Sequence, residues 1–467
     1  MASAASSLSG NSFFGNSIKY TISLYSMPTF LYFPSNLLTF NDINGMFILE
    51  QMFLIRSTGL HKKGRSYNKL MTNIHIPQEL NNIDKLLMME EDAKYEVTND
   101  LDAECTAVFC ANDIKGQHQP PKIPKMFLAS KCIFNCAYCG CRCSREERPN
   151  YCNSPKELAQ LSVNAAKNNG HGVFVTSAIY KNADYTQELL AECVRIMRED
   201  LGYKDFIHAK IMPGADPMLI AKTGQYANRL SVNIEVAHSS GYQRIAKQKN
   251  KSNIMTPMSD IAQQIIEAKY EKRDFATSQT TQLMAGSMNE DDRTIIILSK
   301  ALYKKYHLKR IYYTAFHYTH PAKGYENENL SFTETPRWRM TRLYQADRLL
   351  QLYHFTPDDL TPESHPFLEP DIDPKAAWAL RHLQMYPVEV NKADFETLLR
   401  VPGIGITYAK RIIEARRHCI VTHDLLRKMR IPLKRCIYFI TCNGRYKGEN
   451  ILSSSPELRN RLAQDPD

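Results

Sequence analysis

The stretch LASKCIFNCAYCGCRCSREERPNY, residues 128–151, places five cysteines within twelve residues. Three of them, Cys132, Cys136 and Cys139, have the spacing C-x3-C-x2-C and follow the apolar run KMFLAS at 125–130, which predicts a short buried strand. Three thiolates on a tight loop can hold three irons of a 4Fe–4S cluster and leave the fourth iron open to a substrate or cofactor. The stretch therefore predicts a 4Fe–4S cluster on these three cysteines.

A structural zinc site is the alternative interpretation of the same stretch. Cys143 would then supply a fourth thiolate, because closed sites with four cysteines are common for zinc. Such sites usually join two pairs of cysteines from separate segments, whereas here all the thiols lie in one loop. The spacing favours the iron–sulfur cluster and leaves Cys141 and Cys143 as bystanders.

Composition restricts the class of protein without naming a function. The chain has 467 residues, with 59 Lys and Arg against 49 Asp and Glu, a net charge of +10 and a pI near 8.9. This charge is compatible with a polyanionic partner. The first residues lack the pattern of a secretory signal, and no apolar run is long enough to cross a membrane. Twelve cysteines in such a chain indicate metal binding in a reducing compartment, and the expected location is cytoplasmic.

Alternating strands and helices predict an α/β fold for residues 71–335. Residues 1–70 are expected to be a poorly structured extension or the product of a misassigned start. Helices are predicted at 77–95, 154–170, 184–202 and 292–307, with Ser154 as an N-cap. Strands are predicted at 125–130, 171–179, 205–213, 229–237, 276–286 and 309–316. This alternation predicts a parallel sheet of about six strands, a partial (β/α)6 barrel of the TIM type.

The pattern becomes helical after about residue 333. We expect a helical connector at 336–385, an all-helical domain at 386–445 and a flexible tail at 446–467. The segment VNKADFETLLRVPGIGITYAKRIIEARR, residues 390–417, predicts two helices around a glycine turn.

The glycine turn offers a site for anions. Gly403 and Gly405 allow the backbone to approach a ligand closely, and the helix expected from about Ile406 points its free N–H groups outward. Lys410 and Arg411 follow in its first turns. Residues Gly403 to Gly405, with Ile404 between the glycines, resemble a helix-hairpin-helix motif, which implies contacts with DNA phosphates. A plain helical hairpin used for packing is the alternative.

The cysteine spacing after a first strand resembles the radical S-adenosylmethionine (SAM) superfamily, and about three quarters of the chain, from about residue 92 to 444, resembles its DNA modification/repair family. The stretches that carry this resemblance include FNCAYC, IHAKIMPGADP, RLSVNIE, QTTQLMAG, VNKADFETLLRVPGIG and KRCIYFITCNG. Members are often encoded beside a uracil-DNA-glycosylase-like protein, which the resemblance implies as a partner.

The resemblance also implies a mechanism. SAM binds the open iron through its amino and carboxylate groups, and one electron, from a donor such as flavodoxin or ferredoxin, splits it into methionine and a 5′-deoxyadenosyl radical. That radical then abstracts hydrogen from an unreactive C–H bond of the substrate. The sequence leaves two other functions open: a DNA-binding protein without enzymatic activity that holds iron–sulfur or zinc, and a radical SAM enzyme that acts on RNA or a small molecule.

Residues for SAM are predicted at the ends of the strands. The superfamily often has Gly-Gly-Glu at the end of the second strand, where this chain has VFVTSAI, so Thr176 and Ser177 would take that place. Alternation along strands puts Ser231, Asn233 and Glu235 on one face and gives His208 and Lys210 a common face. These residues could instead fill a layer inside the barrel through hydrogen bonds to one another.

Overall fold

The computed structural model describes Lys85, Met88, Met89 and residues 123–145, 150–169, 172–316, 324–325, 335–449 and 455–463. Residues 1–70, for which the sequence predicts little structure, lie outside the described residues. So does most of the helix expected at 77–95. The described helices include none that combines the length and the apolar character needed to cross a membrane.

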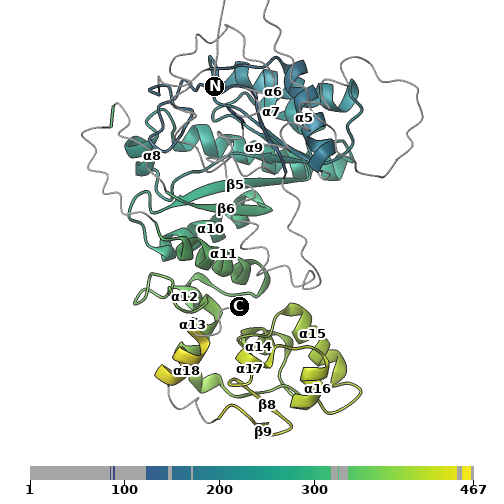
Figure 1. The fold of residues 1–467 in the computed structure, drawn as a ribbon, viewed down its shortest axis with the longest axis vertical. Helices are drawn as coiled ribbons and strands as arrows, with labels where there is room; N and C mark the ends of the chain where they lie inside the picture. Colours follow the sequence, from purple (N-terminus) through teal and green to yellow (C-terminus); the bar gives the residue numbers. More distant parts are fainter. Residues whose placement is uncertain are drawn as a thin grey trace, which may run out of the picture. The chain divides into compact units, whose positions relative to one another are not determined.

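Six parallel strands form one sheet in the order of the sequence, which confirms the predicted α/β fold (Figure 1). The order β1-β2-β3-β4-β5-β6 is that of a barrel built from consecutive strand–helix units. The strands are β1 Lys125–Phe127, β2 Val173–Thr176, β3 Ile207–Lys210, β4 Arg229–Ser231, β5 Ser278–Ala285 and β6 Arg310–Ala315.

Helices alternate with these strands, and local capping fixes where several of them begin. Ser154 and Glu157 form the capping box expected from the sequence, because the Glu157 N–H donates to Ser154 Oγ at 3.2 Å and the Ser154 N–H donates to the Glu157 carboxylate at 2.9 Å. The helices are α5 Pro155–Asn169, α6 Ala183–Glu199, α7 Pro217–Tyr226, α8 Ser240–Ile245, α9 Lys251–Glu271, α10 Asp292–Tyr306 and α11 Arg337–Leu352.

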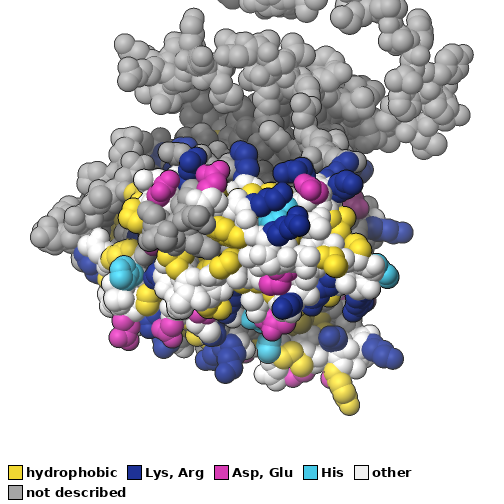
Figure 2. Space-filling model, turned by 90° about the horizontal axis from the view of Figure 1, so that it is seen from below, with side chains coloured by type: hydrophobic (Ala, Val, Ile, Leu, Met, Phe, Trp, Pro, Cys, Tyr) yellow, Lys and Arg dark blue, Asp and Glu magenta, His cyan; other side chains and the backbone are white. Residues whose placement is uncertain are grey.

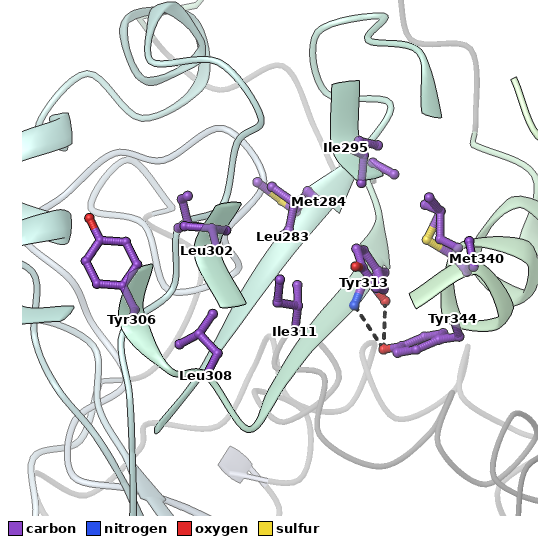
Figure 3. Packing of buried hydrophobic residues seen from close by; sticks show 14 of the residues in the cluster. Leu283, Met284, Ile295, Leu302, Tyr306, Leu308, Ile311, Tyr313, Met340 and Tyr344 are labelled. Carbon is purple, nitrogen blue, oxygen red and sulfur yellow. Dashed lines mark hydrogen bonds between the residues drawn. The ribbon is translucent and has the colours of Figure 1, made fainter. Parts of the chain in front are cut away.

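The two faces of each strand have different roles. Apolar residues on one face, such as Ile207, Leu230 and Ile311, are fully buried in the hydrophobic core. Figure 3 shows this packing where β5 and β6 meet α10 and α11, including the hydroxyl of Tyr344, which donates to the carbonyl of Tyr313 at 3.1 Å. Each such buried side chain stabilises the fold by about 1.5–3 kcal/mol. The alternate residues of β3 and β4 are polar and are considered below.

The C-terminal part is mainly helical, as expected, but it also contains a small sheet. Strands β7 Val388–Glu389, β8 Ile440–Cys442 and β9 Arg445–Tyr446 pair in the order β7-β8-β9. The sequence did not indicate these strands because two or three residues are too few to establish alternation. The helical elements are α12 Pro357–Leu360, α13 Pro374–Arg381, η2 Leu383–Met385, α14 Phe395–Arg400, α15 Ile406–Ala415, α16 His423–Lys428, α17 Leu433–Cys436 and α18 Ser455–Ala463.

Helix α18 lies within 446–467, where the sequence analysis expected a flexible tail. Leu458 and Leu462 of this helix are buried, and Arg459 forms ion pairs with Glu369 and Asp371. The apolar contacts and the ion pairs together explain why helix α18 forms.

Glu389 links β7 to the turn between β8 and β9, and we predict that it makes stability depend on pH. Burial would raise its pKa, but hydrogen bonds from Gly444, Asn391 and Asn443 outweigh burial and lower the pKa from 4.5 to about 2. The ionised form therefore stabilises the fold above pH 4.5, and this contribution is lost as the pH falls towards 2. Unfolding of Glu389→Gln should lack this pH dependence.

The measurement is thermal unfolding between pH 7 and pH 2, compared with Glu188→Gln, which removes an exposed carboxylate on α6. Glu188→Gln should follow the wild type. Equal acid sensitivity of wild type and Glu389→Gln would contradict the prediction.

Candidate functional site

The predicted metal ligands lie on a compact loop directly after β1. Its backbone is closed by the N–H of Cys132, which donates to Cys141 O at 2.7 Å, and by the N–H of Cys143, which donates to Phe134 O at 3.0 Å. Cys141 and Cys143 thus brace the loop through their backbones.

The loop is also attached to the segment that follows α8. The N–H of Ala137 donates to Ile245 O at 2.8 Å, and the N–H of Asn135 donates to Gln248 Oε1 at 3.2 Å. Two contacts of this kind fix the orientation of the loop against residues far away in the sequence.

Burial makes the thiolate forms of Cys132 and Cys136 costly. Burial and the nearby Cys139 raise the pKa of Cys132 to about 11, and burial raises the pKa of Cys136 to about 12. Backbone N–H groups point at two sulfurs: Phe134 N lies 3.3 Å from Cys132 Sγ, and Cys141 N lies 3.4 Å from Cys139 Sγ. Donors of this kind stabilise thiolates that are bound to metal.

Ligation itself remains a prediction. Within the described residues, no three His, Cys, Asp or Glu side chains are grouped as they would be around a metal ion. The donor set nevertheless fits an iron–sulfur cluster, because three cysteines share one loop and backbone N–H groups point at two of their sulfurs.

Lys249, which the sequence did not indicate, connects this loop to Glu235 in the segment that follows β4. Its Nζ lies 2.9 Å from Glu235 Oε1 and 3.0 Å from the hydroxyl oxygen of Tyr138, which stands between Cys136 and Cys139. Burial would lower the pKa of Lys249, but the Glu235 carboxylate and the Cys136 thiol outweigh it and raise that pKa. The ammonium therefore stays charged although its side chain is only 11% exposed.

Glu235 is held by an unusual connection between β4 and β5. Thr281 Oγ1 donates to Val232 O at 2.7 Å and accepts from the N–H of Ile234 at 2.9 Å, so a hydroxyl takes the place of a backbone pair. The pairing resumes at Glu235, whose N–H donates to Gln282 O at 2.9 Å. Glu235 itself has a left-handed backbone, with φ of +62°.

The Glu235 carboxylate has an oxygen available for a ligand. Its Oε2 is buried and has no hydrogen-bond partner among the described residues. Burial would raise the pKa of Glu235, but the charges of Lys249 and Lys210 outweigh burial and lower it. An ionised carboxylate with one unused oxygen can accept a hydrogen bond from a hydroxyl or an ammonium group of a ligand.

The other predicted SAM residues do not all lie equally close to Glu235. Lys210 pairs with Ser231 across β3 and β4, and its charge reaches Glu235. Ser231 ends β4, and Asn233 and Glu235 lie beyond it, so the alternation predicted from Ser231 to Glu235 is not that of one continuous strand. All three side chains are buried, but their common face stays a prediction.

His208, Thr176 and Ser177 occupy different surroundings. The ring of His208 lies 4.3 Å from that of Phe174, two residues before the end of β3. Burial and the charges of Arg229 and Lys210 lower the pKa of His208 well below its usual value. Thr176 ends β2, and its hydroxyl has no partner within the described structure. Ser177 Oγ donates to Ala178 O at 2.5 Å, so that hydroxyl already has an acceptor.

The glycine hairpin joins α14 to α15 as predicted. Gly403 has a φ of +81°, and a Cβ there would lie 3.1 Å from Arg435 Cβ. A Cβ on Gly405 would lie 3.1 Å from the hydroxyl of Tyr353. Gly403 requires glycine for its left-handed backbone, whereas a Cβ at Gly405 would need only a small shift of the Tyr353 hydroxyl.

The inner side of the hairpin is occupied by a lysine. Ile404 is buried, and its carbonyl accepts a hydrogen bond from Lys375 Nζ at 2.5 Å. Lys375 also lies over the ring of Tyr353, with Nζ 5.0 Å from the centroid. The hairpin is thereby anchored to α13 and to the end of α11.

The outer side is basic. Residues 386–449 contain 13 Lys and Arg against 6 Asp and Glu, a net charge of +7 out of the +10 of the chain. Lys410 and Arg411 are exposed on α15, and Figure 2 shows Lys and Arg side chains spread over the face that it views. A second hairpin, α16 to α17, has Arg430 with φ of +58° at its turn. The sequence did not indicate this hairpin because no glycine marks its turn.

Comparisons with known proteins support the hairpin. Residues 385–423 match the family model described as the helix-hairpin-helix motif, which confirms that prediction. No curated protein matches the chain. Among solved structures, the chain is similar to the FeFe-hydrogenase maturase HydG from Carboxydothermus hydrogenoformans, with 14% identity and a TM-score of 0.39 over 67% of this chain and 69% of that chain. Another HydG structure, a maturase of the FeFe-hydrogenase, has 15% identity and a TM-score of 0.35 over 58% of this chain and 62% of that chain.

Proposed function

We propose that this chain is a radical SAM enzyme that modifies or repairs DNA. Cys132, Cys136 and Cys139 would hold a 4Fe–4S cluster. The observation that carries the proposal is the contact of Lys249 with both Tyr138 of the cysteine loop and the ionised Glu235, whose Oε2 has no hydrogen-bond partner among the described residues. When bound, the cluster and SAM supply a 5′-deoxyadenosyl radical that can abstract hydrogen from an unreactive C–H bond.

The polar residues at the ends of β2, β3 and β4 would position SAM. The unused oxygen of Glu235 suits the ribose hydroxyls or the ammonium group, and the ammonium of Lys210 suits the carboxylate. Ser231 and Asn233 would add neutral hydrogen bonds, and Thr176 and Ser177 would replace the glycine-rich segment found in many radical SAM proteins. His208 would fill the interior below them, because it already packs on Phe174.

The helix-hairpin-helix motif would bring the enzyme to DNA. Gly403, Ile404 and Gly405 would present backbone N–H groups to a phosphate, while Lys410 and Arg411 would contact neighbouring phosphates. Such contacts recognise the backbone without reading the bases. The target base would be chosen in the barrel or by a partner such as a uracil-DNA-glycosylase-like protein, and a flavodoxin or ferredoxin in the cytoplasm would donate the electron.

Anaerobic reconstitution tests the proposal. The wild-type protein should bind iron and acid-labile sulfide, show an iron–sulfur absorbance band and release 5′-deoxyadenosine from SAM in the presence of dithionite. Mass spectrometry of nucleosides from DNA incubated with the reduced enzyme and SAM should then reveal the altered base or sugar. A protein loaded with its cluster that leaves SAM intact would instead be a DNA-binding iron–sulfur protein, and a zinc site with four sulfur ligands would exclude the proposal.

The first prediction from this assignment concerns Glu235. Replacement by glutamine keeps the shape of the side chain but removes the charge that receives the ligand's donor groups. A hydrogen bond to a charged group contributes about 1.5–3 kcal/mol, so the Kd of SAM should rise about 10- to 100-fold. Isothermal titration of the cluster-loaded variant under argon measures this change.

The control is Glu267→Gln, which neutralises a carboxylate on α9. It should bind SAM as the wild type does. If Glu235→Gln keeps its iron and binds SAM with unchanged affinity, Glu235 has no part in binding SAM.

A further inference from the structure

Lys249 is a buried cation placed between the cysteine loop and the end of β4. It donates to Glu235 Oε1 at 2.9 Å and to the Tyr138 hydroxyl at 3.0 Å, and the side chains of Lys249 and Glu235 are only 11% and 4% exposed. Burial of an ion pair is costly, and replacement by apolar residues is often neutral or stabilising. A buried lysine at this position therefore calls for an explanation other than stability.

The ammonium of Lys249 lies against the loop that would bind the cluster. Its Nζ is 3.0 Å from the hydroxyl of Tyr138, which stands between Cys136 and Cys139, and 5.7 Å from the centroid of that ring. The fold therefore holds a positive charge next to this loop.

We infer that Lys249 is a positioning residue whose fixed positive charge raises the reduction potential of the cluster at Cys132, Cys136 and Cys139; this inference rests on the proposed function. Reduction adds one negative charge to the cluster. A nearby ammonium in a region of low dielectric stabilises that added charge, whereas a carboxylate opposes it. Lys249 and Glu235 therefore have opposite effects on the potential, and their contact holds the ammonium in place.

The opposite signs separate an electrostatic role from a purely structural one. Lys249→Met removes the positive charge and should shift the equilibrium towards the oxidised cluster by about tenfold. For a one-electron reduction, this makes the reduction potential about 59 mV more negative. Glu235→Gln removes the negative charge and should shift the potential in the positive direction. Lys249→Arg keeps the charge and should lie close to the wild type.

The experiment uses the full chain, reconstituted anaerobically and titrated without SAM, with the reduced cluster followed by electron paramagnetic resonance. Iron and acid-labile sulfide are counted in every sample. Lys247→Met is the matched control, because Lys247 Nζ donates to Gly324 O at 3.1 Å and lies over the ring of Tyr325. Its potential should equal that of the wild type.

Several outcomes would overturn the inference. Normal iron content with unchanged potentials, or shifts of the same sign in Lys249→Met and Glu235→Gln, would make Lys249 only a structural brace. If Lys249→Met loses its iron, the test depends on Glu235→Gln. A reduction potential more positive than that of the wild type would support the inference, and an unchanged or more negative one would contradict it. A wild type that binds no iron and sulfide would refute the proposed function itself.

Discussion

Alanine at any one of Cys132, Cys136 and Cys139 is expected to abolish iron binding and all cleavage of SAM. Each thiol would be one of only three anchors of the cluster, so the loss of one leaves two irons without protein ligands. The loop should survive the change, because its closure depends on backbone hydrogen bonds such as that from Cys132 N to Cys141 O. Iron analysis, absorbance and 5′-deoxyadenosine release measure the effect.

Cys141→Ala and Cys143→Ala provide the matched controls within the same loop. Both residues brace the loop through backbone groups, which alanine retains. These variants should keep the cluster and the reaction. Loss of metal in Cys143→Ala, together with retention of metal in Cys139→Ala, would show that the ligands are assigned wrongly.

Reversal of two charges on α15 is expected to cause the largest loss of DNA binding. Lys410→Glu with Arg411→Glu removes two exposed cations that would contact phosphates, so the slope of log K against log salt should fall by about 2. Affinity near physiological salt should fall at least about tenfold, equally for unrelated sequences. Fluorescence anisotropy with labelled duplexes at several salt concentrations gives both values.

The control carries the same change of charge elsewhere. Lys300→Glu with Lys304→Glu reverses two exposed cations on α10 and should leave the salt slope unchanged. Charge reversal on α15 is a cleaner test than a substitution at Gly403, where any Cβ would press on Arg435 and strain the hairpin. Equal losses in the two double variants would show that only the net charge matters.

The strands were predictable from the sequence because each combines an apolar face with a short, clearly bounded run. Six runs between 125 and 316 contain the six strands, and the capping box at Ser154 marked α5. Helix α9 was not predicted, since Pro257 lies inside it and proline normally ends a helix. The side chains of Met258 and Ile261 are buried in the core, and this burial opposes the destabilising effect of the proline on the helix. Helix α7 has a clear start signal, Asp216 followed by Pro217, that the sequence analysis did not use.

The candidate site was only partly predictable. The cysteines and Glu235 could be found because spacing and alternation along a strand are local properties. Lys249 could not, because its importance comes from contacts with Tyr138 and Glu235 that only the folded chain creates. The left-handed turn at Arg430 was missed for a related reason, since sequence patterns associate this conformation with glycine or asparagine.

The hydroxyl of Thr281 has a consequence for how such a protein could diverge. Most hydrogen bonds between strands join backbone groups and tolerate a change of side chain, but Val232 and Ile234 are joined to β5 through the hydroxyl of Thr281. Valine at 281 would keep the volume and remove both hydrogen bonds, so the end of β4 could take a new direction. Ligand preference could thus change through a residue that never meets the ligand, while the register of the sheet is preserved.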